Sequence, residues 1–151
     1  MTTPSTDAPA PAPLDGVRIV EVASIAAAFA GRQLAELGAD VILVEPPEGA
    51  PTRHRVPYLD QQPGTERSLH HLHYNQGKRS LVLDLDTPEG AATFRRLAAT
   101  ADAVIEAEPH GAMDSRNLGF ESLRATNPAL LYTTVTPFGR TARSPPTAAT
   151  T

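Results

Sequence analysis

Short apolar segments with strand character recur along the chain, separated by segments with helical periodicity. The apolar segments are rich in β-branched or uninterrupted aliphatic residues, as expected for strands of a buried sheet. They cover residues 17–22, 41–44, 81–85, 103–105 and 130–135. Strand and helix therefore alternate. This predicts an α/β fold with an open, mainly parallel, Rossmann-like sheet and helices on both faces.

The first helical segment follows the first predicted strand. Ile25, Phe29, Leu34 and Leu37 lie among alanines at helical spacing, and Gly38 comes next as a stop signal. The pattern predicts a helix that ends at this glycine.

A second helical segment has a complete start signal. Thr87 is a good N-cap, Pro88 suits the first helical position, and Glu89 favours the positive end of the helix dipole. The buried face of this helix is predicted to consist of Phe94, Leu97 and Ala98. Residues 111–126 predict further helix with a break near 117–119.

The loops after the predicted strands are the expected ligand-binding region, because open parallel sheets bind ligands beyond the carboxyl ends of their strands. These loops cover residues 23–28, 45–55, 106–111 and 136–141. The polar, proline-containing residues 46–73 predict a long loop with room for one helical turn. Residues 23–28 contain no glycine, which disfavours a glycine-rich dinucleotide site.

The ends of the chain differ in composition from its middle. Alternating proline and alanine predict a disordered tail over residues 1–13, and prolines followed by small residues predict another over 141–151. Residues 14–140 are expected to form one domain, because 151 residues with 40% hydrophobic content can bury one core. Because we find no secretory signal and no apolar run of membrane-spanning length, we expect a soluble, cytoplasmic protein without a membrane partner.

Charge and cysteine content narrow the classes of function. The formal net charge is −4 and the basic residues are scattered, which argues against a nucleic-acid partner. The chain has no cysteine, which excludes disulfides, thiolate metal sites and a cysteine nucleophile. His70, His71 and His73 cannot all face one point from a regular helix or strand, so we expect no metal site there.

Charged residues near the predicted strands leave two interpretations open. Carboxylates at strand ends can cap backbone amides and make the surface soluble, or they can take part in catalysis. In this chain they are Glu45, Asp84, Asp86, Asp102 and Glu106. Lys78 and Arg79 precede the third predicted strand and could bind a phosphate or form a solvated turn that discourages edge pairing. The chain contains neither a Gly-x-Ser-x-Gly elbow nor a P-loop, so local motifs do not name a reaction.

Longer motifs, taken in chain order, resemble those of the family III CoA-transferases (CaiB/BaiF type). This family includes formyl-CoA and carnitine CoA-transferases and 2-methylacyl-CoA racemases. The motifs are PLDGVRIV at 13–20, LAELGADVI at 34–42, VEPP at 44–47, TR at 52–53, NQGKRS at 75–80, LDL at 83–85, TPEG at 87–90, ADAVIE at 101–106 and FG at 138–139. By these motifs, the chain is identified as the N-terminal portion of a member of this family.

The resemblance implies that CoA or an acyl-CoA is the ligand and that no metal is needed. It implies CoA phosphates on Lys78 and Arg79, Arg53 as a further cation, and Asn75 as a positioning donor. Ala26, Ala27 and Ala28 would form the turn beside the pantetheine. Phe138 and Gly139 would form part of the wall of the binding site.

The family's reactions depend on groups beyond these motifs. Relatives transfer CoA between carboxylic acids through an acyl-carrying aspartate, or racemise 2-methylacyl-CoA with a histidine and an aspartate, and all of these lie further downstream. The resemblance therefore assigns no catalytic residue here, and we expect no activity from this chain alone. Because full-length relatives form interlocked dimers around a larger sheet, we expect an incomplete large domain that self-associates. A non-catalytic interaction module and a degenerate, non-functional remnant are the alternatives.

Several positions depart from the family pattern. Ala27 and Ala28 stand where relatives usually carry Gly-Pro, and Glu108 stands within a segment that usually reads Glu-Asn-Phe-Arg. A glutamate at this point would repel a phosphate. Arg116 lies one position beyond the place where relatives commonly have an arginine.

Overall fold

Parallel strands form the centre of the structure, a computed structural model that describes residues 11–137 and 139. The sheet has five strands in the order β3-β2-β1-β4-β5, and each neighbouring pair is parallel. The strands are β1 (Arg18–Val22), β2 (Asp40–Glu45), β3 (Arg79–Val82), β4 (Ala103–Glu106) and β5 (Leu131–Thr134). This arrangement confirms the predicted α/β class.

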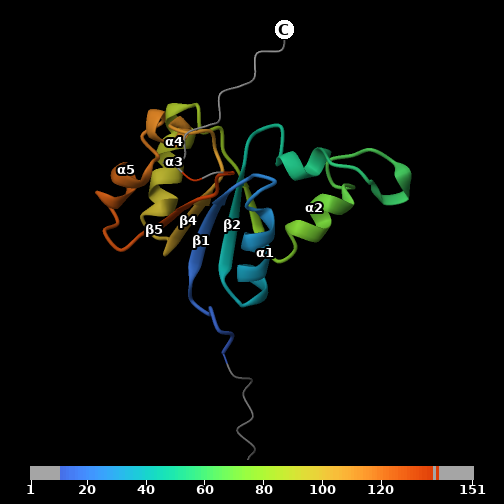
Figure 1. Cartoon of the computed structure of the whole chain (residues 1–151), viewed down its shortest axis with the longest axis horizontal. Helices are drawn as coiled ribbons and strands as arrows, with labels where there is room; N and C mark the ends of the chain where they lie inside the picture. The colour runs from blue at the N-terminus through green and yellow to red at the C-terminus, as the bar shows by residue number, and fades with distance from the viewer. Residues whose placement is uncertain (1–10, 138, 140–151) are drawn as a thin grey trace, which may run out of the picture.

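Helices lie on both faces of this sheet (Figure 1). α1 packs on one face and contacts α2 beside it, whereas α3, α4 and α5 pack on the other. The helices are α1 (Ala28–Glu36), α2 (Leu69–Tyr74), α3 (Pro88–Ala98), α4 (Ala112–Ser115) and α5 (Phe120–Arg124). Two 3₁₀ turns, η1 (Pro51–His54) and η2 (Leu59–Gln61), lie between β2 and α2. No helix within the described residues is long and apolar enough to cross a lipid bilayer.

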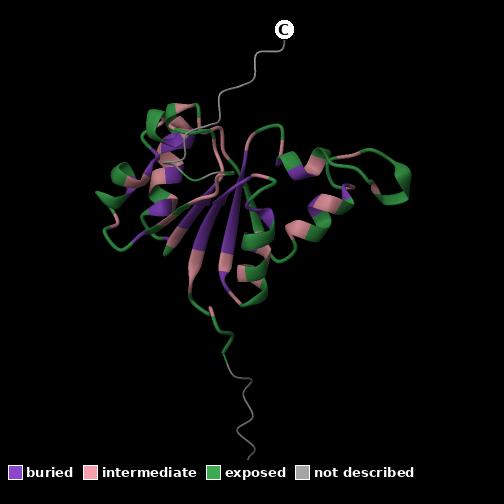
Figure 2. Ribbon diagram, in the orientation of Figure 1, coloured by how far each residue is buried: buried purple, intermediate pink, exposed green. Residues whose placement is uncertain are grey.

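Alternation along the strands places the two largest clusters of the core on opposite faces of the sheet. Val20 and Val104 belong to the larger cluster, which packs against Phe94 of α3. Ile19 and Ile105 belong to the smaller cluster, which packs against α1. Figure 2 shows that burial is concentrated along the central strands. The predicted buried face of α3 is confirmed, since Phe94 and Ala98 are buried and Leu97 is partly buried.

The helix ends follow the predicted local signals. The Thr87 hydroxyl accepts a hydrogen bond from the Gly90 amide at 3.1 Å, and Pro88 is the first residue of α3. The backbone of Gly38 has a φ of +99°, a left-handed conformation that glycine adopts at little cost after the end of α1. Both predicted signals are therefore confirmed.

The third strand lies earlier in the sequence than predicted. It covers Arg79–Val82 instead of residues 81–85, because its pairing with β2 starts at Arg79 opposite Ile42. The last amide in this register, that of Leu83, donates to the carbonyl of Glu45. Leu83 therefore ends the ladder, Leu85 lies beyond it, and both side chains pack partly against the core.

The segment between β2 and β3 contains more regular structure than predicted. Residues 46–73 include both 3₁₀ turns and most of α2. The Ser68 hydroxyl caps α2 by accepting from the His71 amide at 3.2 Å, and it donates to the carbonyls of Thr52 and Arg55. One serine thus starts the helix and fixes it to η1, a long-range arrangement that local composition does not reveal.

The predicted helix after β1 is confirmed, but its large apolar residues are not its buried side. Ile25, Phe29 and Leu37 are exposed, and the buried residues of α1 are Ala28 and Gly31. A Cβ atom at Gly31 would collide with the Glu21 carboxylate of β1. Small residues therefore let α1 lie close to a buried charged side chain of the sheet.

Candidate functional site

A crevice of about 460 Å³ lies at the carboxyl ends of β1, β2 and β3. It includes the region between β1 and β4, where the strand order reverses and where open α/β sheets bind ligands. The residues that line the crevice are Val22, Ala23, Val44, Glu45, Pro46, Pro47, Glu48, Pro51, Leu83, Asp84, Leu85, Asp86, Glu108 and Arg116. The predicted loops 23–28, 45–55 and 106–111 each contribute residues to the lining of the crevice. The predicted loops do not include residues 83–86, because the sequence predicts strand over 81–85, although Asp84 and Asp86 are among the candidate carboxylates.

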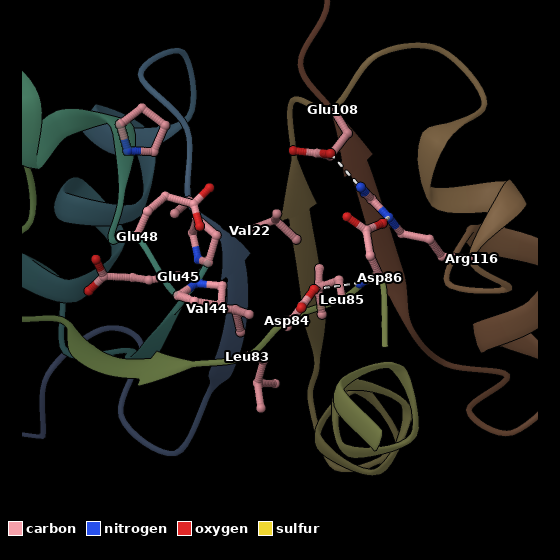
Figure 3. A pocket seen from close by; sticks show the side chains of 14 residues that line it. Val22, Val44, Glu45, Glu48, Leu83, Asp84, Leu85, Asp86, Glu108 and Arg116 are labelled. Carbon is pink, nitrogen blue, oxygen red and sulfur yellow. Dashed lines mark hydrogen bonds and ion pairs between the residues drawn. The ribbon is translucent and has the colours of Figure 1, made fainter. Parts of the chain in front are cut away.

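Apolar side chains form part of the crevice wall, beside five carboxylate residues and one arginine. Val22 and Val44 come from the ends of β1 and β2, and Leu83 and Leu85 come from the segment after β3. Figure 3 shows these four side chains between the charged groups of the crevice. Such walls suit the uncharged part of an organic ligand, because contact removes apolar surface from water on both sides.

Arg116 is the cation among the residues that line the crevice. Its Nε donates to Asp86 Oδ1 at 2.7 Å, and its Nη1 donates to Glu108 Oε2 at 2.9 Å (Figure 3). Hydrogen bonds to Asp86 and Glu108 raise the pKa of Arg116 above its ordinary value, so the guanidinium stays charged. The sequence offered one signal for this residue: an arginine displaced by one position from the family pattern.

Glu45 lies at the end of β2 and has a well-satisfied carboxylate. It accepts hydrogen bonds from Arg53 Nε (2.6 Å), Arg53 Nη2 (2.8 Å), the Ser80 hydroxyl (2.6 Å) and the Ala50 amide (2.7 Å). Burial alone would raise the pKa of Glu45, but the hydrogen bonds from Arg53, Ser80 and Ala50 outweigh it and lower the pKa to about 2. Arg53 also pairs with Glu66 at 2.6 Å. The guanidinium predicted as a CoA cation therefore has two carboxylate partners, and its role as a ligand contact stays a prediction.

Lys78 lies beneath α1, outside the crevice lining. Its Nζ is 2.7 Å from Glu21 Oε2 and donates to the Ala28 carbonyl and to Asn75 Oδ1, both at 2.8 Å. Burial is the main reason that the pKa of Glu21 rises to about 7 and that the pKa of Lys78 falls below its ordinary value. In the structure, Lys78 connects β1, α1 and Asn75, and its predicted contact with a phosphate stays a prediction.

Asn75 extends this buried network toward η1 and α2. Its Nδ2 donates to the Thr52 hydroxyl at 3.0 Å, and the same hydroxyl lies 2.8 Å from His71 Nδ1. Burial, followed by the charge of Arg53, lowers the pKa of His71, which favours its neutral form. Asn75 is thus a positioning donor toward protein groups in the structure.

The three neighbouring histidines have separate surroundings. His71 faces Thr52, the ring of His70 lies against Tyr74, and the ring of His73 contacts Arg32 Nη1 at 3.0 Å. Within the described part of the chain, no group of three or more His, Cys, Asp or Glu side chains is placed to hold a metal ion.

Arg79 lies at the amino end of β3, opposite the crevice. Its Nε pairs with Asp40 Oδ1 at 2.9 Å, and Arg18 pairs with the same aspartate. Because Arg79, Asp40 and Arg18 begin three adjacent parallel strands, all three lie at the edge of the sheet remote from the carboxyl ends. The assignment of Arg79 to a CoA phosphate stays a prediction.

The turn predicted to lie beside the pantetheine, Ala26 to Ala28, follows Ala23, which lines the crevice. Ala26 is exposed, whereas Ala27, the N-cap of α1, and Ala28, its first residue, are buried. Gly139 is exposed, and its amide donates to the Thr136 hydroxyl at 2.7 Å. Phe138, the other predicted wall residue, lies outside the described residues.

The open parallel sheet and the crevice at its carboxyl edge place this chain in the class of α/β domains that bind ligands at that edge. Within that class the profile of CoA-transferase family III matches residues 14–150, and the chain belongs to this family. The match confirms the resemblance found in the sequence motifs.

Individual relatives agree with the family match. The chain is 45% identical over 133 residues to a succinate–glutarate CoA-transferase of Agrobacterium fabrum, covering 85% of this chain and 33% of the relative. It is 41% identical over 124 residues to a subunit of a succinyl-CoA:(R)-benzylsuccinate CoA-transferase of Thauera aromatica, covering 82% of this chain and 30% of the relative. A crystal structure of a CaiB/BaiF family protein from Brucella suis superposes with a TM-score of 0.80 at 46% identity, covering 88% of this chain and 35% of that one. The chain therefore spans about a third of the length of these relatives.

Proposed function

We propose that this chain supplies the CoA-binding part of a family III CoA-transferase and binds acyl-CoA in the crevice at the carboxyl ends of β1, β2 and β3. The crevice carries this proposal, because it joins apolar residues to one cation, Arg116, in a lining that also contains five carboxylate residues. Membership of the family supplies the class of ligand. The reaction to which this binding contributes is transfer of CoA between carboxylic acids or, in the racemase branch, racemisation of a 2-methylacyl-CoA.

The parts of the ligand match different parts of the crevice. The apolar walls fit the pantetheine arm or the adenine ring, since both lose water-exposed surface there. Arg116 provides a planar, permanently charged fork for a phosphate oxygen. Lys78, Arg79 and Arg53 are the alternative phosphate contacts that the family resemblance implies.

Lys78 and Asn75 have a positioning role in this proposal. Lys78 donates to the carbonyl of Ala28 in the first turn of α1, so it holds the turn that begins at the crevice. Asn75 joins Lys78 to Thr52, which follows the crevice loop 45–51. The two side chains thereby fix loops on either side of the ligand without contacting it.

Calorimetric titration with CoA tests the proposal. We expect saturable heat for the chain, and at least tenfold weaker binding for Arg116→Gln, because a charge-assisted phosphate contact is worth about 1.5–3 kcal/mol. Arg67→Gln is the matched control, since Arg67 is also ion-paired with an aspartate but does not line the crevice. The absence of any heat would contradict CoA binding. Loss of binding in Arg79→Gln but not in Arg116→Gln would place the phosphate at the other edge of the sheet.

The open edges of the sheet favour a second candidate, a non-catalytic interaction module that associates with other chains. Among the described strands, β3 and β5 each have one neighbour, and all four residues of β3 are exposed. Unpaired backbone groups beside Val82 and Leu131, whose exposed fractions are 56% and 68%, can pair with another strand. Concentration-dependent association without any heat on addition of CoA would favour this module over the CoA-binding function.

A further inference from the structure

Arg116 joins two loops across the mouth of the crevice. It caps the carboxyl end of α4, and its side chain reaches Asp86, which follows β3, and Glu108, which follows β4. The two loops come from strands that are not neighbours in the sheet, because β2 and β1 lie between β3 and β4. One guanidinium thus connects distant parts of the crevice rim.

The backbone amide of each acidic residue is hydrogen-bonded within its own loop. The Asp86 amide donates to Asp84 Oδ1 at 3.0 Å, and the Glu108 amide donates to Glu106 Oε2 at 2.7 Å. The loop backbones are therefore fixed on either side of Arg116. The two partners differ in exposure, since the side chain of Asp86 is 74% exposed and that of Glu108 is 25% exposed.

This arrangement affects the binding of an anion in a definite way. Two carboxylates and one guanidinium carry a net negative charge, so a phosphate that approaches Arg116 meets repulsion as well as attraction. The phosphate must displace a carboxylate or share the guanidinium with both. Asp86 is the easier partner to displace, because an exposed ion pair is stabilised weakly.

We propose that Asp86 and Glu108 are specificity-determining residues that compete with ligand phosphate for Arg116. They weaken binding of the phosphorylated part of CoA and leave binding of the uncharged pantetheine part unchanged. The inference rests on the proposed function, since it assumes that the crevice is the site of CoA. The affinity of this chain for phosphate then depends on Asp86 and Glu108 as much as on Arg116.

Calorimetric titrations with CoA, pantetheine and inorganic pyrophosphate test the inference on Asp86→Asn, Glu108→Gln and the double variant. Each single change should tighten binding of CoA and pyrophosphate about two- to fivefold, as expected for loss of one partly exposed charge contact. Binding of pantetheine should stay the same. Asp60→Asn is the matched control, because Asp60 is 73% exposed and pairs with Arg67 away from the crevice.

The same substitutions in an Arg116→Gln background show whether the effect acts through the guanidinium. In that background, the increase in CoA affinity caused by Asp86→Asn should be smaller, because Asp86 no longer competes with phosphate for Arg116. CoA affinity that is unchanged or weakened in both Asp86→Asn and Glu108→Gln would overturn the inference while leaving CoA binding intact. Tighter pyrophosphate binding by the variants, with no CoA binding by any form, would uphold the competition and reject the proposed function. Failure of every form to bind CoA and pyrophosphate would reject both.

Discussion

The ammonium of Lys78 lies 2.7 Å from the carboxylate of Glu21, and their side chains are 1% and 0% exposed. The pair joins the residue that precedes β3 to the middle of β1, across the face of the sheet that α1 covers. Such a pair is maintained by mutual attraction and by the remaining hydrogen bonds, because each charge alone would be costly to bury. Lys78 therefore has a structural role whether or not a ligand binds nearby.

Removing one partner of this pair should destabilise the fold strongly. Lys78→Met leaves the Glu21 carboxylate without its cation, and we expect a loss of about 3–5 kcal/mol in the free energy of unfolding at pH 8. The double variant Glu21→Leu/Lys78→Met should recover most of this loss, since no buried charge remains. Urea unfolding measures both values. Equal instability of the single and double variants would show that packing, not charge, governs the site.

Glu45 should make stability depend on pH in the acid range. Its pKa is about 2 in the folded chain against 4.5 for the free side chain, so its contribution is complete above pH 4.5 and is lost as the pH falls toward 2. The loss amounts to about 3 kcal/mol. The difference in unfolding free energy between the wild type and Glu45→Gln should therefore narrow as the pH is lowered through this range. A constant difference from pH 5 to pH 2.5 would contradict the prediction.

The N-cap of α3 offers a local test. Thr87→Ala removes the acceptor for the Gly90 amide and should lower stability by about 1 kcal/mol. Thr87→Ser keeps the hydroxyl and is the control. Thermal unfolding followed by circular dichroism compares the variants, and equal melting temperatures for the alanine and serine forms would show that the cap contributes nothing measurable.

The exposed edges of the sheet predict self-association. Sedimentation velocity over a range of concentrations should reveal species larger than the monomer, because β3 and β5 leave one side of their ladders unpaired. Leu131→Lys places a charge on the exposed face of β5 and should reduce association without loss of stability. Ser122→Lys, at an exposed position of α5, is the matched control. A single monomeric species of the wild type at all concentrations would contradict this prediction.

The sequence by itself determined the class of fold, the end of α1, the start of α3, and the family. The helix ends can be predicted from the sequence because Thr87 and Gly38 act on backbone groups within four residues. A strand such as β2 can be predicted because its apolar residues are consecutive in the chain. Family motifs are likewise linear. Only the tertiary structure decided what the charged residues do.

Lys78 meets Glu21 because the order β3-β2-β1 lets a side chain just before β3 reach β1 across β2. Arg116 meets Asp86 and Glu108 because the loops after β3 and β4 converge at the crevice. An ion pair depends on distance and burial in space, and neither is encoded in the spacing of charges along the sequence.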